Sequence, residues 1–253
     1  MERHGLKINA NKCEFGKQEL DFLGHQIDKN GIAPITTKVS AIRDYELPKT
    51  IKDLGRFLGM LNFYRRFVKQ TATTLATLYD LLVKYNKLPK SKVMQWEPQQ
   101  LQSFDNAKNA LADVTNLAYP IPNAQLILAA DANDVAVEAV VHQQDTEGNI
   151  TPVGFFSRRL DKRQQKFSTF SRELLAVYLG VCHFRTTIEF RHVVINTDHM
   201  TLVHSARKCR REGNFGGNRT IDVNCELFNR MEACPRFNKP NSRCSIESST
   251  ANN

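Results

Sequence analysis

Two short apolar runs that each end in an aspartate place the strongest constraint on the fold. Residues 126–130 are followed by Asp131, and residues 193–197 are followed by Asp198. Between them, a segment with helical spacing of apolar residues carries Glu173. Apolar runs of this length are typical of buried strands, and acids at neighbouring strand ends, with a third on a crossing helix, suit hard divalent cations. We therefore expect Asp131, Glu173 and Asp198 to converge on metal ions.

The spacing of apolar residues changes near residue 124, from a helical period to runs typical of strands. We predict strands at 125–130, 135–142, 151–157 and 192–197, and a helix at 168–185. Strands with one long helix among them indicate an α+β fold with a mixed sheet and a covering helix.

The N-terminal part begins with a hairpin and continues with helices. The run 22–28, followed by an Asn-Gly pair, predicts a strand and a turn. Thr50 and Asp53 have the spacing of a capping box at a helix start. Apolar residues then recur every three or four positions: Ile51, Leu54, Phe57, Leu58, Leu61 and Phe67. Further helices are predicted at 38–46, 72–84 and 98–112.

The chain is basic, with 35 Lys and Arg against 26 Asp and Glu and a net charge of +9. Five positive charges lie around and after the helix that starts at Thr50: Lys52, Arg56, Arg65, Arg66 and Lys69. Such a run is usually the solvated face of an amphipathic helix, but it also suits phosphate contacts with a nucleic acid.

No apolar run approaches the ~20 residues that span a bilayer, and no apolar signal segment follows Met1. A membrane partner and secretion are therefore not expected. The prediction is an intracellular location, in the cytoplasm or the nucleus.

An ordered series of motifs carries a resemblance to a known family. The chain resembles the reverse transcriptase to ribonuclease H segment of the Pol polyprotein of gypsy/Ty3-type LTR retrotransposons, over roughly residues 5–206. The motifs are Phe22-Leu23-Gly24-His25, Lys38-Val39, the run from Arg56 to Phe67, Trp96, Asp131-Ala132, the run from Phe156 to Leu160, Arg172 to Ala176, and Thr197-Asp198-His199.

The resemblance implies a domain order and a chemistry. By motif position, Asp131, Glu173 and Asp198 would bind two Mg²⁺ or Mn²⁺ ions that cut the RNA strand of an RNA–DNA hybrid. The partners implied are that hybrid or a primer–template duplex, and the rest of a Pol polyprotein. The resemblance implies that residues 1–47 are the end of the reverse transcriptase palm, 48–85 are thumb-like helices and 124–206 are the N-terminal part of an RNase H-like domain. The sequence pattern predicts a connector with a helix at 86–123. Residues 207–253 have few sustained apolar patterns, which predicts a divergent, disordered tail.

The chain also departs from the family pattern. The family's polymerase acids lie in a Tyr-x-Asp-Asp hairpin, and this sequence contains no adjacent aspartates. Ala136 and Glu138 stand where the family usually has glycines, and a carboxylate at 138 would repel phosphates if it faces the groove. No fourth acid follows, so the expectation is a fragment with a truncated RNase H-like sheet.

Three alternatives stay open on sequence alone. The chain could be a non-catalytic nucleic-acid-binding remnant, or an integrase-like nuclease, although those usually place their final acid on a helix. Each acid could also be an ordinary surface group: Glu173 could pair with Arg172, and Asp198 could cap a helix. His199 could assist the chemistry or simply end a strand, and Trp96 is expected to pack as a core anchor.

Overall fold

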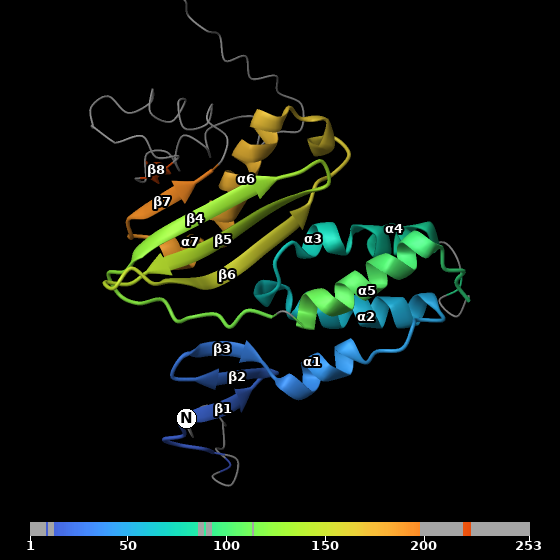
Figure 1. The fold of residues 1–253 in the computed structure, drawn as a ribbon, viewed down its shortest axis with the longest axis horizontal. Coiled ribbons are helices and arrows are strands. Elements are labelled where there is room, and N and C mark those ends of the chain that lie inside the picture. Colours follow the sequence, from blue (N-terminus) through green and yellow to red (C-terminus); the bar gives the residue numbers. More distant parts are fainter. Residues whose placement is uncertain are drawn as a thin grey trace, which may run out of the picture.

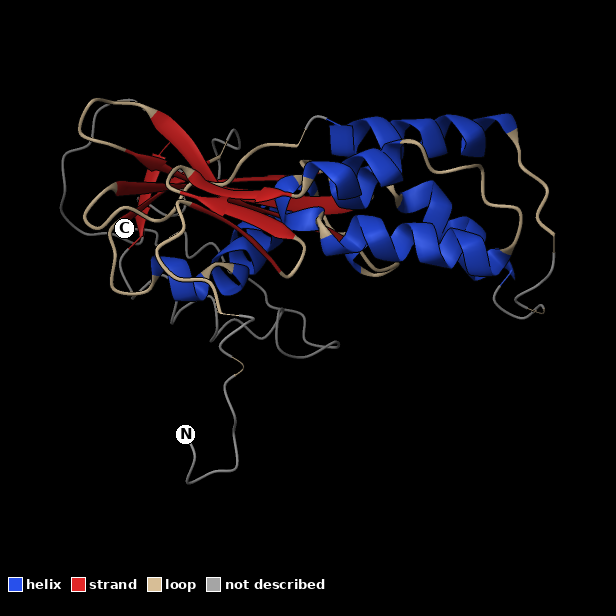
Figure 2. Cartoon of the chain, turned by 90° about the horizontal axis from the view of Figure 1, so that it is seen from below, coloured by secondary structure: helices blue, strands red, loops and turns tan. Residues whose placement is uncertain are grey.

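The computed structural model describes residues 9, 13–85, 89, 93–112, 114–197 and 220–223, with backbone alone at 112 and at 220–223. Three parts follow one another along the chain: a small hairpin sheet, a helical lobe and a five-stranded sheet with its covering helix. The helical lobe lies beside the larger sheet, as Figure 1 and Figure 2 show from two directions.

The N-terminal sheet is an antiparallel meander of three short strands, β1 (Glu19–Phe22), β2 (His25–Asp28) and β3 (Gly31–Pro34). The expected single strand over 22–28 is wrong, because the chain reverses at Leu23 and Gly24. Both residues have positive φ, 48° and 81°, and such a pair matches the twist of a tight hairpin. The second turn follows Asp28, whose carboxylate accepts hydrogen bonds from the backbone N–H groups of Asn30 and Gly31.

Gly31 ties this small sheet to the connector that leads into the larger sheet. Ile32 and Leu117 exchange backbone hydrogen bonds of 2.8 and 3.0 Å. A Cβ at Gly31 would lie 2.1 Å from the carbonyl oxygen of Leu117. Only glycine permits the connector to approach so closely.

The helical lobe is built around one amphipathic helix. The Thr50–Asp53 capping box is present, with each side chain bonded to the other residue's backbone N–H. The six apolar residues expected on its inner face are all buried, but the helix ends at Phe63 and a 3₁₀ turn carries Phe67 inward. The elements are α1 (Thr36–Arg43), α2 (Ile51–Phe63), η3 (Arg65–Phe67), α3 (Thr71–Thr74), α4 (Ala76–Tyr85) and α5 (Pro98–Ala112).

The single helix expected over 72–84 is divided into α3 and α4 at Leu75. Gln70 precedes α3 in the left-handed region, with φ of 54°. α3 itself reads Thr-Ala-Thr-Thr, and β-branched threonines with hydroxyls that compete for backbone bonds favour short helices. The helix expected at 98–112 is confirmed as α5, and that expected at 38–46 is confirmed with shifted bounds as α1.

Trp96 packs in the helical lobe, as expected of a core anchor. Its indole N–H donates to the carbonyl oxygen of Pro48 at 2.8 Å, and its ring meets Phe104 edge-on at 5.8 Å.

The larger sheet is mixed, as predicted, with the strand order β6-β5-β4-β7-β8. β4 and β7 are parallel, and the other neighbours are antiparallel. Its strands are β4 (Gln125–Ala132), β5 (Ala136–Gln144), β6 (Ile150–Arg159), β7 (Val193–Asn196) and β8 (Thr220–Val223). β8 falls in the tail that was expected to be disordered. At these four residues the chain instead extends the sheet beyond β7; the rest of the tail lies outside the described residues.

One face of this sheet is covered by α6 (Thr169–His183), which follows η4 (Gln164–Lys166) and precedes α7 (Arg185–Ile188). Alternate residues of β4 and β5 form a core with the apolar side of α6. Gly180 lets the helix come close, because a Cβ there would lie 2.7 Å from the Cβ of Ala139.

The opposite face of the sheet meets the helical lobe near β5 and β6. The backbone N–H of Ala72 donates to the Ser157 hydroxyl at 2.9 Å, and Arg159 forms an ion pair with Asp80. Phe155 belongs to the core of the helical lobe. Within the described part of the chain, no helix is both long and apolar enough to cross a lipid bilayer.

The close approach at Gly180 predicts opposite effects for two matched substitutions. Gly59→Ala, in α2, meets nothing within 4 Å and should raise the free energy of unfolding by about 1 kcal/mol through helix propensity. Gly180→Ala gains the same propensity but overpacks the sheet, which costs about 1–3 kcal/mol. Urea unfolding followed by circular dichroism should show Gly180→Ala less stable than Gly59→Ala. Equal stabilisation of both variants would contradict the packing of α6.

Candidate active site

Asp131 lies near the end of β4 on the face of the sheet that points away from α6. Residues alternate along the strand, so Ala130 and Ala132 pack toward α6 while Asp131 points to the other side. Its cross-strand partner is Glu138 on β5. The Asp131 side chain is exposed, as a group that meets a substrate must be.

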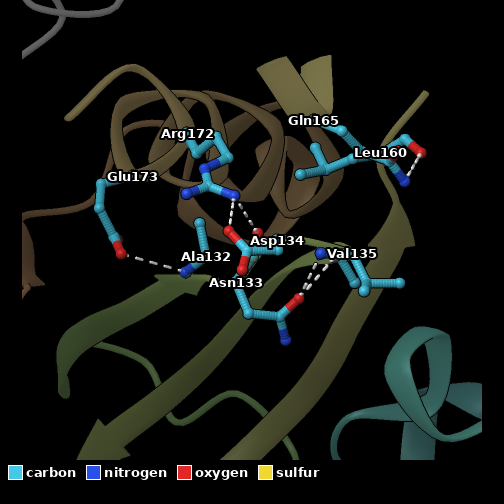
Figure 3. Close-up of polar contacts among 9 residues, drawn as sticks. Ala132, Asn133, Asp134, Val135, Leu160, Gln165, Arg172 and Glu173 are labelled. Atoms are coloured by element: carbon cyan, nitrogen blue, oxygen red, sulfur yellow. Dashed lines mark hydrogen bonds and ion pairs between the residues drawn. The ribbon is translucent and has the colours of Figure 1, made fainter. Parts of the chain in front are cut away.

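Glu173 reaches the same strand end from α6. It lies in the second turn of the helix, whose N-terminus is capped by the Ser168 hydroxyl. The residue is only 4% exposed, and its carboxylate accepts a 3.3 Å hydrogen bond from the backbone N–H of Ala132. Figure 3 shows this carboxylate directed at the backbone nitrogen of Ala132.

The third expected acid, Asp198, and its neighbour His199 lie outside the described residues. β7 stops at Asn196, which is in register with Ala129 of the parallel strand β4. The two strands therefore end at the same edge of the sheet. Among the residues that the structure describes, no three His, Cys, Asp or Glu side chains are close enough together to share a metal ion. The full triad remains a prediction.

The two described acids fit a hard divalent cation in their chemistry. Carboxylate oxygens are the ligands that Mg²⁺ and Mn²⁺ prefer. A carboxylate as buried as that of Glu173 is costly unless a positive charge or hydrogen bonds compensate it, and a cation beside Asp131 would contribute to that compensation.

The turn between β4 and β5 is held against the start of α6. Arg172 forms an ion pair with Asp134 and donates to the carbonyl oxygen of Asn133 at 3.4 Å (Figure 3). Arg172 is thus engaged by the turn, whereas sequence alone left it open as a partner for Glu173. The Asn133 side chain accepts bonds of 2.8 Å from the N–H groups of Val135 and Ala136, which shapes the turn.

A cleft of about 440 Å³ opens beside Asp131, between the sheet and the segment that follows η3. Its floor includes small or apolar residues of β4 and β5, and Lys69 and Glu138 line it. The Lys69 ammonium lies 5.8 Å from the centre of the Phe155 ring. His142 also lines the cleft, and burial, with a smaller effect of Lys69, holds its pKa below the usual value.

Glu138 faces this cleft, so the condition for the predicted phosphate repulsion is met. Burial, and to a smaller degree the negative charge of Asp131, raise the pKa of Glu138 to about 7, against the opposing effect of a hydrogen bond from Thr73. That bond, from the Thr73 hydroxyl at 3.2 Å, comes from α3 in the helical lobe. Near neutral pH the carboxyl is therefore only partly ionised.

The five basic residues proposed from sequence are all exposed, but they do not share one site. Lys69 lines the cleft beside Asp131. Arg65 and Arg66 lie near the C-terminal end of α6, where their charges add to burial in lowering the pKa of His183. Lys52 and Arg56 lie near Asp53 in the first turns of α2.

Sequence reasoning missed the residues that hold the site together. Asn133 and Asp134 directly follow a strand end, where such residues commonly shape turns, and this signal could have identified them. Thr73 bonds both Asn133 and Glu138 across the lobe boundary, and no local pattern marks a contact between residues so far apart in sequence.

Comparison with known proteins agrees with this architecture. Residues 96–195 match the family model described as "RNase H-like domain found in reverse transcriptase". The Tf2-3 and Tf2-4 transposon polyproteins of Schizosaccharomyces pombe are each 31% identical to the chain over 205 residues. That alignment covers 80% of this chain and 15% of each polyprotein.

Over most of its length the chain is therefore similar to retrotransposon polyproteins. Residues 96–195 form a domain similar to the RNase H-like domain of reverse transcriptases.

Two solved structures share the fold at 18% identity. One is the foamy viral protease-reverse transcriptase dRH in complex with double-stranded DNA, with a TM-score of 0.62 over 78% of this chain and 34% of that chain. The other is the foamy viral protease-reverse transcriptase in complex with an RNA/DNA hybrid, with a TM-score of 0.61 over 78% of this chain and 26% of that chain. At 78% of this chain, each likeness includes residues outside 96–195.

The raised pKa of Glu138 predicts a pH-dependent stability of the RNase H-like domain. Between about pH 4.5 and 7 the unfolded chain releases this proton while the folded chain retains it. The free energy of unfolding should therefore fall as pH rises through that window. Glu138→Gln should remove this contribution, which melting temperatures measured in EDTA from pH 5 to 8 would show.

Thr73→Val is the matched comparison, because it should raise the pKa of Glu138 further, whereas Glu138→Gln removes the titrating group. Thr73→Val removes the hydrogen bond that lowers the pKa of Glu138, so the loss of stability should extend to higher pH than in the wild type. If Glu138→Gln and the wild type show the same pH profile, Glu138 does not titrate in this window.

Proposed function

We propose that the RNase H-like domain hydrolyses the RNA strand of an RNA–DNA hybrid at Asp131 and Glu173. The observation that carries this proposal is the delivery of the buried Glu173 carboxylate to the strand end that bears Asp131. The family match over residues 96–195 supports it, as does a related fold in a protein solved with an RNA/DNA hybrid. Asp198 completes the proposed acid set.

Two Mg²⁺ or Mn²⁺ ions, held by Asp131, Glu173 and Asp198, would supply an activated water and neutralise charge on the leaving oxygen. The residues of the chain would hold the ions and orient the bound strand. Glu173 is fixed by the Ala132 N–H, and Asp131 faces the cleft. Lys69, which lines the cleft, would contact a phosphate of the bound strand.

The remaining parts take the roles expected from the resemblance. We assign residues 1–47 to the end of a polymerase palm, 48–85 to a thumb whose basic residues contact the duplex backbone, and 86–123 to a connector. No adjacent aspartates occur in the sequence, so we do not assign polymerisation to this chain. The chain spans about 15% of the length of the transposon polyproteins it matches, and the other parts of such a polyprotein are its proposed partners.

A cleavage assay tests the assignment directly. With Mn²⁺ and a labelled RNA–DNA hybrid, the wild type should cut the RNA strand. Asp131→Asn and Glu173→Gln should each abolish detectable cleavage, because each removes a charged ligand of the ions. Lys29→Ala, in the turn between β2 and β3, serves as the unaffected control. A wild type that binds the hybrid but does not cut it would instead support a non-catalytic nucleic-acid-binding remnant.

The proposed phosphate contact of Lys69 predicts a change in salt dependence. Lys69→Ala should weaken binding of hybrids of any sequence and should reduce the slope of log K against log salt by about 0.9. Lys29→Ala should leave the slope unchanged. Fluorescence anisotropy between 50 and about 200 mM salt measures both slopes, and an unaltered slope in Lys69→Ala would remove Lys69 from the interface.

A further inference from the structure

The turn at Asn133 and Asp134 connects three elements of the molecule. It follows β4, which carries Asp131, and the guanidinium of Arg172 on α6 contacts it. The Asn133 amide donates to the Thr73 hydroxyl at 3.1 Å, which joins the turn to the helical lobe.

Arg172 is buried to an extent unusual for an ion-paired arginine. Its side chain is 12% exposed, whereas that of Asp134 is 87% exposed. The Arg172 Nε is buried and has no acceptor among the described residues. Because a buried guanidinium is costly unless paired, its position depends on the carboxylate of Asp134 and the carbonyl of Asn133.

Arg172 and Glu173, which are consecutive in α6, therefore bind the two ends of the short segment from Ala132 to Asp134. Glu173 accepts from the N–H of Ala132, and Arg172 binds the backbone and side chain one and two residues further on. The contacts draw the end of β4 and the start of α6 together, as Figure 3 shows. Together, the Glu173–Ala132, Arg172–Asn133 and Arg172–Asp134 contacts form a clamp between α6 and the turn.

We propose that Arg172 and Asp134 are positioning residues, whose ion pair sets the spacing of the Asp131 and Glu173 carboxylates and so the affinity for divalent cations. The metal-binding part rests on the proposed function, whereas the clamp itself does not. An exposed ion pair would contribute little. This pair differs because its arginine is buried and bonds the turn twice.

The clamp is tested first without metal. In EDTA, amide exchange followed by NMR reports the Ala132 N–H, which the clamp holds against Glu173. Arg172→Gln and Asp134→Asn should each accelerate its exchange by at least about tenfold, since a weakened clamp lets that bond open more often. Arg185→Gln, at the exposed Arg185–Glu189 pair in the same domain, should not.

Metal affinity is tested next by calorimetric titration with Mn²⁺. Groups that orient metal ligands typically contribute 10–100-fold to affinity. Arg172→Gln and Asp134→Asn should therefore raise the Kd for Mn²⁺ by about that factor. Arg172→Lys, which keeps the charge, should recover part of the loss. Circular dichroism confirms that each variant is folded, and a general loss of structure would not produce recovery by lysine.

The outcomes separate the two proposals. Unchanged exchange and unchanged Kd in both variants, with a wild type that binds Mn²⁺, overturn the clamp and leave the proposed function standing. Faster exchange with a wild type that binds no Mn²⁺ supports the clamp but overturns its role in metal affinity, together with the proposed function. Faster exchange with a weaker Kd supports both.

Discussion

The site depends on the close packing of α6 against β4 and β5. The helix can deliver Glu173 to the end of β4 only if it lies near the sheet, and Gly180 permits that approach over Ala139. The alternating apolar residues of both strands supply the free energy for this packing. A carboxylate 4% exposed is then held in a place that an isolated strand or helix could not provide.

The helical lobe contributes side chains that contact the candidate site. Thr73 of α3 bonds Glu138 and Asn133, so the lobe contacts both β5 and the turn that follows Asp131. It also supplies Lys69 to the wall of the cleft. The basic charges gathered along one stretch of sequence are therefore divided between the cleft, the end of α6 and the start of α2, and only the first of these lies beside Asp131.

Periodicity predicted the mixed sheet and most helices because it reports which side of an element is buried, as at Ile51 and Leu54 of α2 or Leu126 and Leu128 of β4. The same periodicity predicted some elements as continuous where the structure divides them. The reversal at Leu23 and Gly24, for example, depends on backbone angles that no apolar pattern encodes. The apolar pattern and the resemblance both predicted that Glu173 lies on a helix that brings it near Asp131. The clamp was not predicted, because the pairing of Arg172 with Asp134 arises only after α6 and the turn have met.

Glu138 brings opposing effects to one position. Its burial and the nearby Asp131 disfavour the ionised form, and ionised it would repel a phosphate in the same cleft. A divalent cation at Asp131 acts in the other direction, because positive charge favours the carboxylate. If the proposed cation binds at Asp131, its binding would favour proton release at Glu138 and would offset the repulsion that the ionised acid would exert on a phosphate. Under the proposed function, an acid in place of glycine at this position would make substrate binding more dependent on the metal than glycine would.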